Sequence, residues 1–179
     1  MSGFLLCKMS RPFRVLITLL CMVFGLFSQA QTITIGAGTA TQRYPLGVYY
    51  GYQRDASLYT AAEINLPAGG SVLSVAWNAT TATSAATPVK VYLKSVPAAT
   101  TTLTSQDWPT ATAGASLVYT GTINNITTGW NTITLQSPFY YNGTENLVVL
   151  VEVSYGGTGT GSTSGSAFTY SNAASRHMY

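Results

Sequence analysis

The sequence has 179 residues, of which 46% are hydrophobic and only 7% are charged, and its formal net charge is +3. Three basic residues, Lys8, Arg11 and Arg14, precede an apolar run, and residues 31–179 balance five basic against five acidic side chains. This balance argues against nucleic acid or an anionic membrane as a partner, because both attract clustered positive charge.

Residues 1–30 have the order of a secretory signal peptide. A basic start is followed by a thirteen-residue apolar run, and Ser28 and Ala30 are small residues at the positions that signal peptidase reads. We expect cleavage before Gln31 and no membrane insertion afterwards, because the run is shorter than the roughly 20 residues that cross a bilayer. The alternatives are an uncleaved anchor and lipidation at Cys21, which the bulky residue before it disfavours. The expected location is therefore outside the cell or on its surface.

Both cysteines, Cys7 and Cys21, lie in this segment. Residues 31–179 can therefore form no disulfide, and the exported domain depends on core packing. At about 150 residues it can bury roughly 68–70% of its unfolded surface, and one domain is the natural count.

Residues 31–179 predict strands joined by turns and show no helical period. The clearest strand is 89–94, where valine and leucine alternate with lysine and tyrosine. The strand-like runs are 32–35, 57–64, 71–77, 89–94, 116–123, 130–135, 146–154 and 167–170.

Two segments indicate how the strands are arranged. Residues 147–151 (LVVLV) are continuously apolar, which is typical of a central strand covered on both faces. The pair Asn142-Gly143 predicts a hairpin that joins residues 139–141 to this strand. We therefore expect an all-β fold, an antiparallel two-sheet β-sandwich that is jelly-roll-like, with a closed barrel as the alternative.

Two further segments concern the extent of the domain. The glycine- and serine-rich residues 156–165 indicate a long hairpin loop rather than a linker, because strand-like residues resume at 167. Residues 175–179 (SRHMY) indicate the start of another strand. We therefore expect a single domain over 31–179 that is truncated at its C-terminus and belongs with other domains of a longer polypeptide.

The titratable residues do not form a catalytic pattern. The exported part has one histidine, His177, and no sequence signature of a serine nucleophile with its base. Its acids are too scattered to suggest the carboxylate pair of a glycosidase, so we expect a protein that is not an enzyme. Oxygen-rich loops suit a structural calcium ion, the one cofactor left open. The acids expected at turns are Asp55, Asp107 and Glu145, and those expected on strands are Glu63 and Glu152.

Aromatic side chains are the candidate binding groups, because flat rings stack on sugars and are frequent in protein interfaces. Trp77, in phase with Leu73 and Val75, and Trp130, which opens a strand, are assigned to the core. Trp108, in the turn QDWP, is expected to be exposed. The candidate ligand-binding residues are Trp108, Tyr49, Tyr50, Tyr52 and Tyr155.

The stretch 49–60 (YYGYQRDASLYT) combines four tyrosines with an Arg-Asp pair. We expect it to lead into a strand, with a mainly structural role and a binding role for its first tyrosines as the alternative. Arg54 and Asp55 would point apart and hold the turn that enters the strand. Leu58, Thr60, Ala62 and Ile64 would then share one face of the strand.

Four passages together resemble a known β-sandwich module: YYGYQRDASLYTAAEI, SQDWP, GWNTITLQSPFYYNGTENLVVLVE and SNAASRHMY. The module occurs in large secreted and surface proteins of bacteria that have a type IX secretion system, and the resemblance covers nearly all of residues 44–179. It implies a jelly-roll-like, adhesin-like module, usually accompanied by fibronectin type III domains or peptidases and by a C-terminal sorting domain. The sequence shows no sorting domain, which puts the export route in doubt. The resemblance implies no catalytic residues.

The expected function is adhesion or binding at the cell surface, without catalysis, with a glycan or a surface protein as ligand. The alternatives are a purely structural spacer of a larger secreted protein and an accessory module of a secreted peptidase or glycosidase.

Overall fold

The computed structural model describes residues 30–161 and 165–179. Residues 35–179 form one compact unit. The predicted signal peptide, apart from Ala30, lies outside the described residues. In the part of the chain that is described, no helix has the length and apolar character to cross a membrane.

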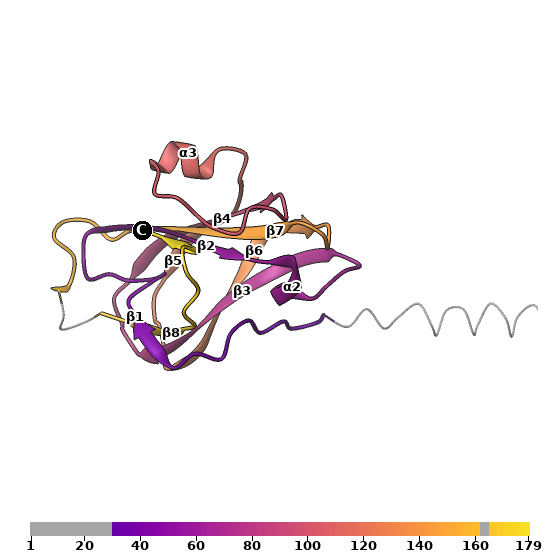
Figure 1. Cartoon of the computed structure of the whole chain (residues 1–179). Helices are drawn as coiled ribbons and strands as arrows, with labels where there is room; N and C mark the ends of the chain where they lie inside the picture. Colours follow the sequence, from indigo (N-terminus) through magenta and orange to yellow (C-terminus); the bar gives the residue numbers. More distant parts are fainter. Residues whose placement is uncertain (1–29, 162–164) are drawn as a thin grey trace, which may run out of the picture. The chain divides into compact units, whose positions relative to one another are not determined.

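The described residues form two antiparallel sheets (Figure 1). The four-stranded sheet has the order β1-β8-β3-β6, and the five-stranded sheet has the order β5-β4-β7-β2-β9. The strands of the first are β1 (Ala40–Gln42), β8 (Ala167–Tyr170), β3 (Gly70–Thr81) and β6 (Gly129–Tyr141). Those of the second are β5 (Ser116–Ile123), β4 (Thr87–Val96), β7 (Asn146–Ser154), β2 (Tyr52–Tyr59) and β9 (His177–Met178).

The pairing of the strands is that of a jelly roll. The pairs β1·β8, β2·β7, β3·β6 and β4·β5 are nested, as in one long hairpin whose tip lies between β4 and β5. The pairs β4·β7 and β3·β8 then join these arms side by side. The predicted antiparallel two-sheet β-sandwich is confirmed, and the chain forms two sheets with separate edges rather than a closed barrel.

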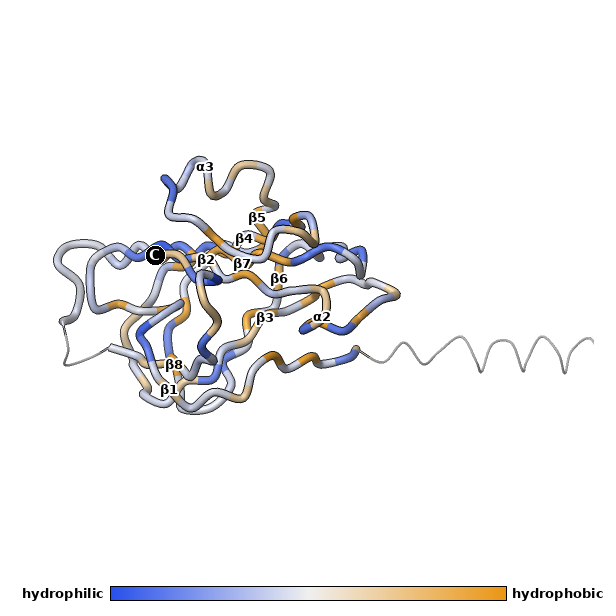
Figure 2. The backbone as a smooth tube through the Cα atoms, in the orientation of Figure 1, coloured by the Kyte–Doolittle hydropathy of each residue, from blue (hydrophilic) through white to orange (hydrophobic). Residues whose placement is uncertain are grey.

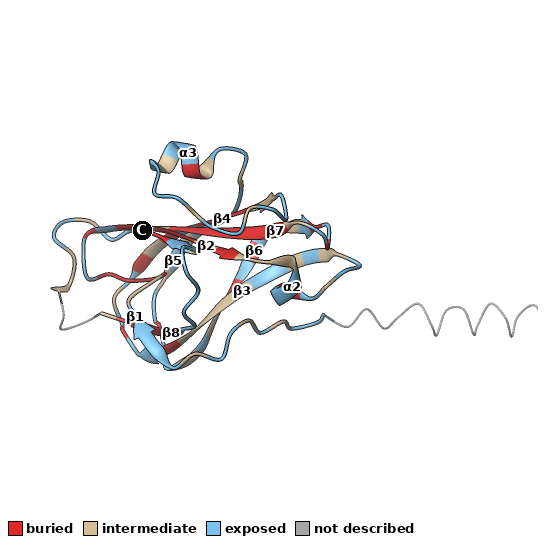
Figure 3. Cartoon of the chain, viewed as in Figure 1, coloured by how far each residue is buried: buried red, intermediate tan, exposed pale blue. Residues whose placement is uncertain are grey.

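The central strand β7 is buried on both faces (Figure 3). The register sets Val89, Val91 and Leu93 of β4 beside its residues Val153, Val151 and Val149, and all six are buried on one face. Its other face presents Val148 and Leu150, which are 1% exposed. Figure 2 shows the apolar residues that run along this strand. The prediction of a central strand at 147–151 is therefore confirmed.

The outward face of β7 is buried because residues 97–115, here called the cover segment, pack over it. The segment contains α3 (Trp108–Thr112), whose first turn is capped by Asp107: its carboxylate accepts a hydrogen bond from the Thr110 N–H at 2.9 Å. A second apolar cluster forms between the segment and the sheet, from Ala56, Leu58, Val148, Leu150, Met178 and Ala111, with Leu103 and Trp108 packed against it.

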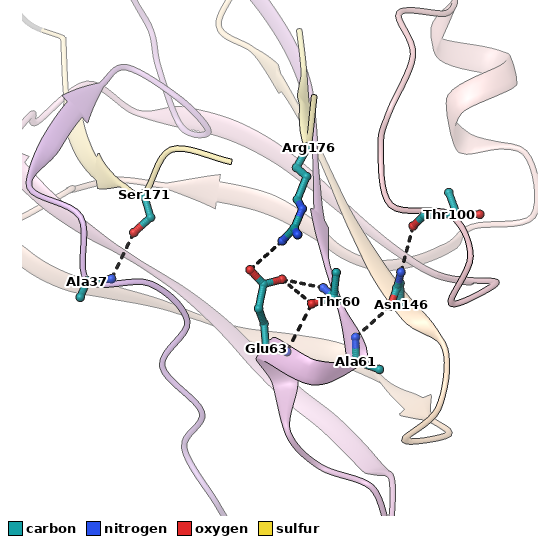
Figure 4. A network of polar contacts seen from close by, with 8 residues as sticks. All are labelled: Ala37, Thr60, Ala61, Glu63, Thr100, Asn146, Ser171 and Arg176. Carbon is teal, nitrogen blue, oxygen red and sulfur yellow. Dashed lines mark hydrogen bonds and ion pairs between the residues drawn. The ribbon is translucent and has the colours of Figure 1, made fainter. Parts of the chain in front are cut away.

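Two of the predicted strands are wrong wholly or in part. Residues 32–35 form no strand. The strand predicted at 57–64 ends at Tyr59, because Thr60 starts a short helix, α2 (Ala61–Ile64). The Thr60 hydroxyl accepts the Glu63 N–H, and the Glu63 carboxylate accepts the Thr60 N–H at 2.9 Å (Figure 4). This capping box outweighs the strand propensity of the segment, so the predicted shared face of Leu58, Thr60, Ala62 and Ile64 does not exist.

The hairpin predicted at Asn142-Gly143 is also wrong. β6 pairs with β3, whereas β7 pairs with β2 and β4, so this turn connects the two sheets. Asn142 organises the turn through its side-chain oxygen, which accepts the N–H groups of Thr144 and Glu145 at 3.0 Å. Gly143 has φ of 83° and lies against the backbone of Pro67, where a side chain would collide. The local turn signal was present, but it carried no information on which strands it joins.

Asn146 is buried at the start of β7 and connects three parts of the fold (Figure 4). Its side-chain oxygen accepts the Ala61 N–H at 2.8 Å, at the start of α2. Its amide nitrogen donates to the carbonyls of Ala98 and Thr100 in the cover segment, at 3.1 and 2.9 Å. One side chain therefore fixes both the helix and the cover segment to the central strand.

We predict that Asn146→Ala lowers the free energy of unfolding by about 2–3 kcal/mol, because three backbone groups lose their partner. Urea denaturation followed by circular dichroism measures this. The control is Asn125→Ala at an exposed site, where a change within about 0.5 kcal/mol is expected. Equal midpoints for the two variants would show that Asn146 has no such role.

Candidate functional site

A continuous series of ring contacts connects residues 43–50 with the residues around β9. The Arg43 guanidinium lies 4.7 Å from the ring centroid of Tyr44 and 5.2 Å from that of Tyr50. Tyr50 contacts Tyr49 edge-on at 4.7 Å, and Tyr44 stacks on Tyr179 at 4.9 Å. Together with His177, which contacts both Tyr44 and Tyr179, we call these residues the aromatic strip: Arg43, Tyr44, Tyr49, Tyr50, His177 and Tyr179.

Burial and hydrogen bonds hold the segment that carries Tyr44, Tyr49 and Tyr50 to the rest of the domain. Leu46 and Val48, which lie in the sequence between Tyr44 and Tyr49, are completely buried. The Gln53 side chain donates to the Pro45 carbonyl at 2.9 Å. The glycine-rich loop after β7 also contributes, because the Thr160 N–H donates to the Val48 carbonyl at 2.8 Å. Loops fixed on a rigid scaffold in this way are typical places for binding residues.

The other end of the strip depends on β9. This two-residue strand pairs with Ala56 and Ser57 of β2. Met178 is buried against the sheet, and His177 Nδ1 lies 3.0 Å from the Ser57 hydroxyl. The contact fixes the imidazole ring beside Tyr44. Burial lowers the pKa of His177, so the ring is neutral at neutral pH.

Three tyrosine rings of the strip are open to solvent. Tyr179 is 77% exposed, Tyr50 55% and Tyr49 36%. Arg43 is fixed among them, since its guanidinium donates to the Tyr44 hydroxyl at 2.8 Å. Its Nε is buried and has no hydrogen-bond partner among the described residues. The surface therefore offers flat rings and one oriented cation, the combination that stacks on and hydrogen-bonds polar ring compounds.

A buried carboxyl group lies below the strip. Asp55 is 1% exposed and accepts a hydrogen bond from Gln53 at 3.2 Å, and the same amide nitrogen donates to Pro45. Burial raises the pKa of Asp55 well above its ordinary value, and the hydrogen bond from Gln53 lowers it by a smaller amount. Asp55 thus helps to position the loop that carries Tyr44.

The expectation for Arg54 and Asp55 was partly right. They point to opposite faces of β2, because Asp55 is buried while Arg54 donates to Glu152 at 2.8 Å on the outer face. They do not hold the turn before the strand, since both lie within β2. Asp55 is therefore not at a turn, and Glu63 lies in α2 rather than on a strand.

The structure separates the predicted binding residues into groups. Tyr49 and Tyr50 belong to the aromatic strip. Tyr52, at 67% exposure, begins β2 and pairs with Ser154, and Tyr155, at 37%, directly follows β7. Neither forms a ring contact with the strip. Trp108 is half-buried in the cover segment, where its ring lies edge-on to Tyr92 at 6.1 Å and 5.7 Å from the Arg54 guanidinium.

The expectations for the tryptophans need correction. Trp108 was expected to be exposed, but it packs against the second apolar cluster. Trp130 was assigned to the core and is 58% exposed, because its position in β6 points outward, beside Asn78. Trp77 is half-buried on the face of β3 that carries Val75. Leu73 is out of phase with them, because the pairing shifts between Val72 and Ser74, and it is 50% exposed.

Sequence reasoning missed four residues of the strip: Arg43, Tyr44, His177 and Tyr179. The adjacent Arg43-Tyr44 pair was a usable signal, since arginine and tyrosine are both enriched in interfaces. Tyr179 and His177 gave no local signal, because only the pairing of β9 with β2 brings them to Tyr44.

The structure places the remaining acids and a serine-histidine pair. Glu63 pairs with Arg176 at 2.7 Å, and Glu152 is shared by Arg54 and Lys90. Among the described residues there is no group of three or more side chains of His, Cys, Asp and Glu that could hold a metal, so the calcium prediction has no assigned site. The contact of Ser57 with His177 was not foreseen from the sequence. Asp55 lies on the same strand as Ser57, but its hydrogen bond is with the Gln53 side chain.

Comparisons with family models, with curated proteins and with solved structures found no match.

We predict that Asp55→Asn stabilises the protein at neutral pH. A carboxyl whose folded-state pKa is raised favours folding most below its ordinary value of 3.8, and this contribution is lost as the pH rises through the folded-state pKa. The amide has no charge to bury, and its oxygen still accepts from Gln53. The gain should therefore be present at pH 7 and disappear towards pH 4, as measured by urea denaturation.

The control for this prediction is Asp107→Asn. Hydrogen bonds from Thr110 lower the pKa of the exposed Asp107 carboxyl, so its contribution is present at neutral pH and is lost in acid. The two variants should therefore change stability in opposite directions at pH 7. A wild-type protein more stable than Asp55→Asn at pH 7 would contradict the assignment.

Proposed function

We propose that this chain is an exported binding module without catalytic activity, which holds a glycan against the aromatic strip. One observation carries the proposal: six side chains from two distant parts of the sequence form an uninterrupted series of ring and cation contacts, in which Tyr49, Tyr50 and Tyr179 are exposed and Arg43 and Tyr44 are half-buried. Rings that served only the core would be buried. The exposure of Tyr50 and Tyr179 therefore supports binding over a spacer role.

The chemistry of the strip favours a saccharide. Sugar rings present C–H groups on one face and hydroxyls at the edge, which match a tyrosine face and its polar hydroxyl. Arg43 adds N–H donors and a positive charge beside the rings. The residues of the strip include no carboxylate, so neutral and acidic sugars both suit it.

The setting of the module is part of the proposal. The signal-peptide pattern and the resemblance to modules of type IX-secreted proteins support secretion or display at the cell surface, with other domains in the same polypeptide. A surface protein is the alternative ligand, since tyrosine and arginine are also enriched in protein interfaces. An accessory role beside a peptidase or glycosidase is compatible with the same binding chemistry.

We predict that a glycan array detects saturable binding of the purified protein, and that Tyr50→Ala and Tyr179→Ala each weaken it by about tenfold, which corresponds to about 1.4 kcal/mol for a lost stacking ring. Circular dichroism verifies folding of each variant. Tyr140→Ala is the matched control, because Tyr140 is 69% exposed on β6 and does not belong to the strip.

Three outcomes would contradict the proposal. Binding that survives both strip substitutions places the site elsewhere, and binding lost equally in Tyr140→Ala indicates a non-specific surface. If the folded protein binds no glycan, the glycan proposal fails and a protein ligand replaces it.

A further inference from the structure

A small cavity lies between the outer face of the five-stranded sheet and the cover segment. No residue of the aromatic strip lines it, although Met178, between His177 and Tyr179, does. Its volume is about 170 Å³. The sheet side of its lining is apolar apart from Lys94, with Ala56, Val148 and Leu150. The cover segment contributes both polar and apolar residues: Thr100, Thr102, Leu103, Thr104, Gln106 and Ala111. The cavity therefore offers an apolar surface for a tail, with polar groups and one charged side chain beside it.

Lys94 supplies the only charge in this lining. It lies on β4 beside Val148 of β7, and its ammonium group donates to the Ala111 carbonyl in the cover segment at 2.5 Å. An ammonium group has three N–H donors. The ion pairs among the described residues are Arg54–Glu152, Lys90–Glu152 and Arg176–Glu63, so Lys94 takes part in none of them. No aspartate or glutamate lines the cavity.

The positive charge of Lys94 is thus placed beside apolar side chains without a counter-charge. Burial lowers its pKa, as expected for a cation that loses water and gains no anion. A bound carboxylate would supply the missing charge and accept hydrogen bonds from the free donors. Inorganic anions would supply the charge but would leave the apolar wall uncovered.

We propose that this cavity binds a small aliphatic carboxylate, with its carboxylate group on the Lys94 ammonium and its tail on Val148 and Leu150. The size is appropriate, because an engineered cavity of about 150 Å³ holds benzene, which has six non-hydrogen atoms. Butyrate has the same number of non-hydrogen atoms. This site uses none of the side chains proposed to bind a glycan and would give the module a second, small-molecule ligand.

The test uses the whole protein, methyl-labelled for NMR, and titrates it with butyrate, butanamide and sulfate. Butyrate should shift the methyl signals of Val148 and Leu150 in a saturable way. Butanamide, which has the same shape without the charge, and sulfate, which has charge without a tail, should each bind at least about tenfold more weakly. Equal binding of butanamide or of sulfate overturns the proposal, and so does the absence of a shift with butyrate.

Substitution of the lysine gives a second test. Lys94→Met keeps the aliphatic stem and should weaken butyrate binding by at least about tenfold, whereas Lys90→Met, on the same strand and exposed, should leave it unchanged. Lys94 also holds the Ala111 carbonyl, so a loss of binding in this variant can have two causes, the missing charge or a loosened cover segment. The butanamide comparison on the wild-type protein distinguishes them. Unchanged butyrate binding by a folded Lys94→Met variant contradicts the assignment.

Discussion

The burial of β7 on both faces is the constraint on which the rest of the structure depends. A strand as apolar as residues 146–153 needs a partner layer on each side. The four-stranded sheet covers one face, and the cover segment, held by the Asn146 side chain, covers the other. The same requirement creates the Lys94 cavity, because an irregular segment cannot match a flat sheet closely everywhere along its length.

The aromatic strip depends on a polar feature of the neighbouring strand. Gln53 and Asp55 of β2 are buried and hydrogen-bonded to each other, and Gln53 also holds the Pro45 carbonyl. Burying an ionisable carboxyl group without a counter-charge destabilises the folded protein. Here Asp55 fixes the loop that presents Tyr44 and Tyr50, so the aromatic strip and the buried polar pair form one unit. The stability gain expected on neutralising Asp55 measures what that arrangement costs.

Much of the fold could be predicted from the sequence, because period-two patterns and apolar runs report local burial. The strands at 116–123, 146–154 and 167–170 have the predicted limits. Errors arose where a specific side-chain contact decided the local conformation, as at the Thr60 cap, or where a turn signal did not identify its strands, as at Asn142-Gly143. Of the candidate site, the sequence patterns singled out Tyr49 and Tyr50, but Tyr179 joins them only through a long-range pairing that no local pattern encodes.

The nested pairing of the strands also has a kinetic consequence. Only β4 and β5 at the tip are near neighbours in sequence, whereas Ala40 pairs with Tyr170 and Ala56 with Met178. Contacts of such long sequence separation form slowly, since the loop between them must close first. The docking of β9, which brings Tyr179 to Tyr44, is therefore among the last events that the topology allows. Until it occurs, a nascent or partly folded chain has only half of the strip, so the complete strip exists only in molecules that have finished folding.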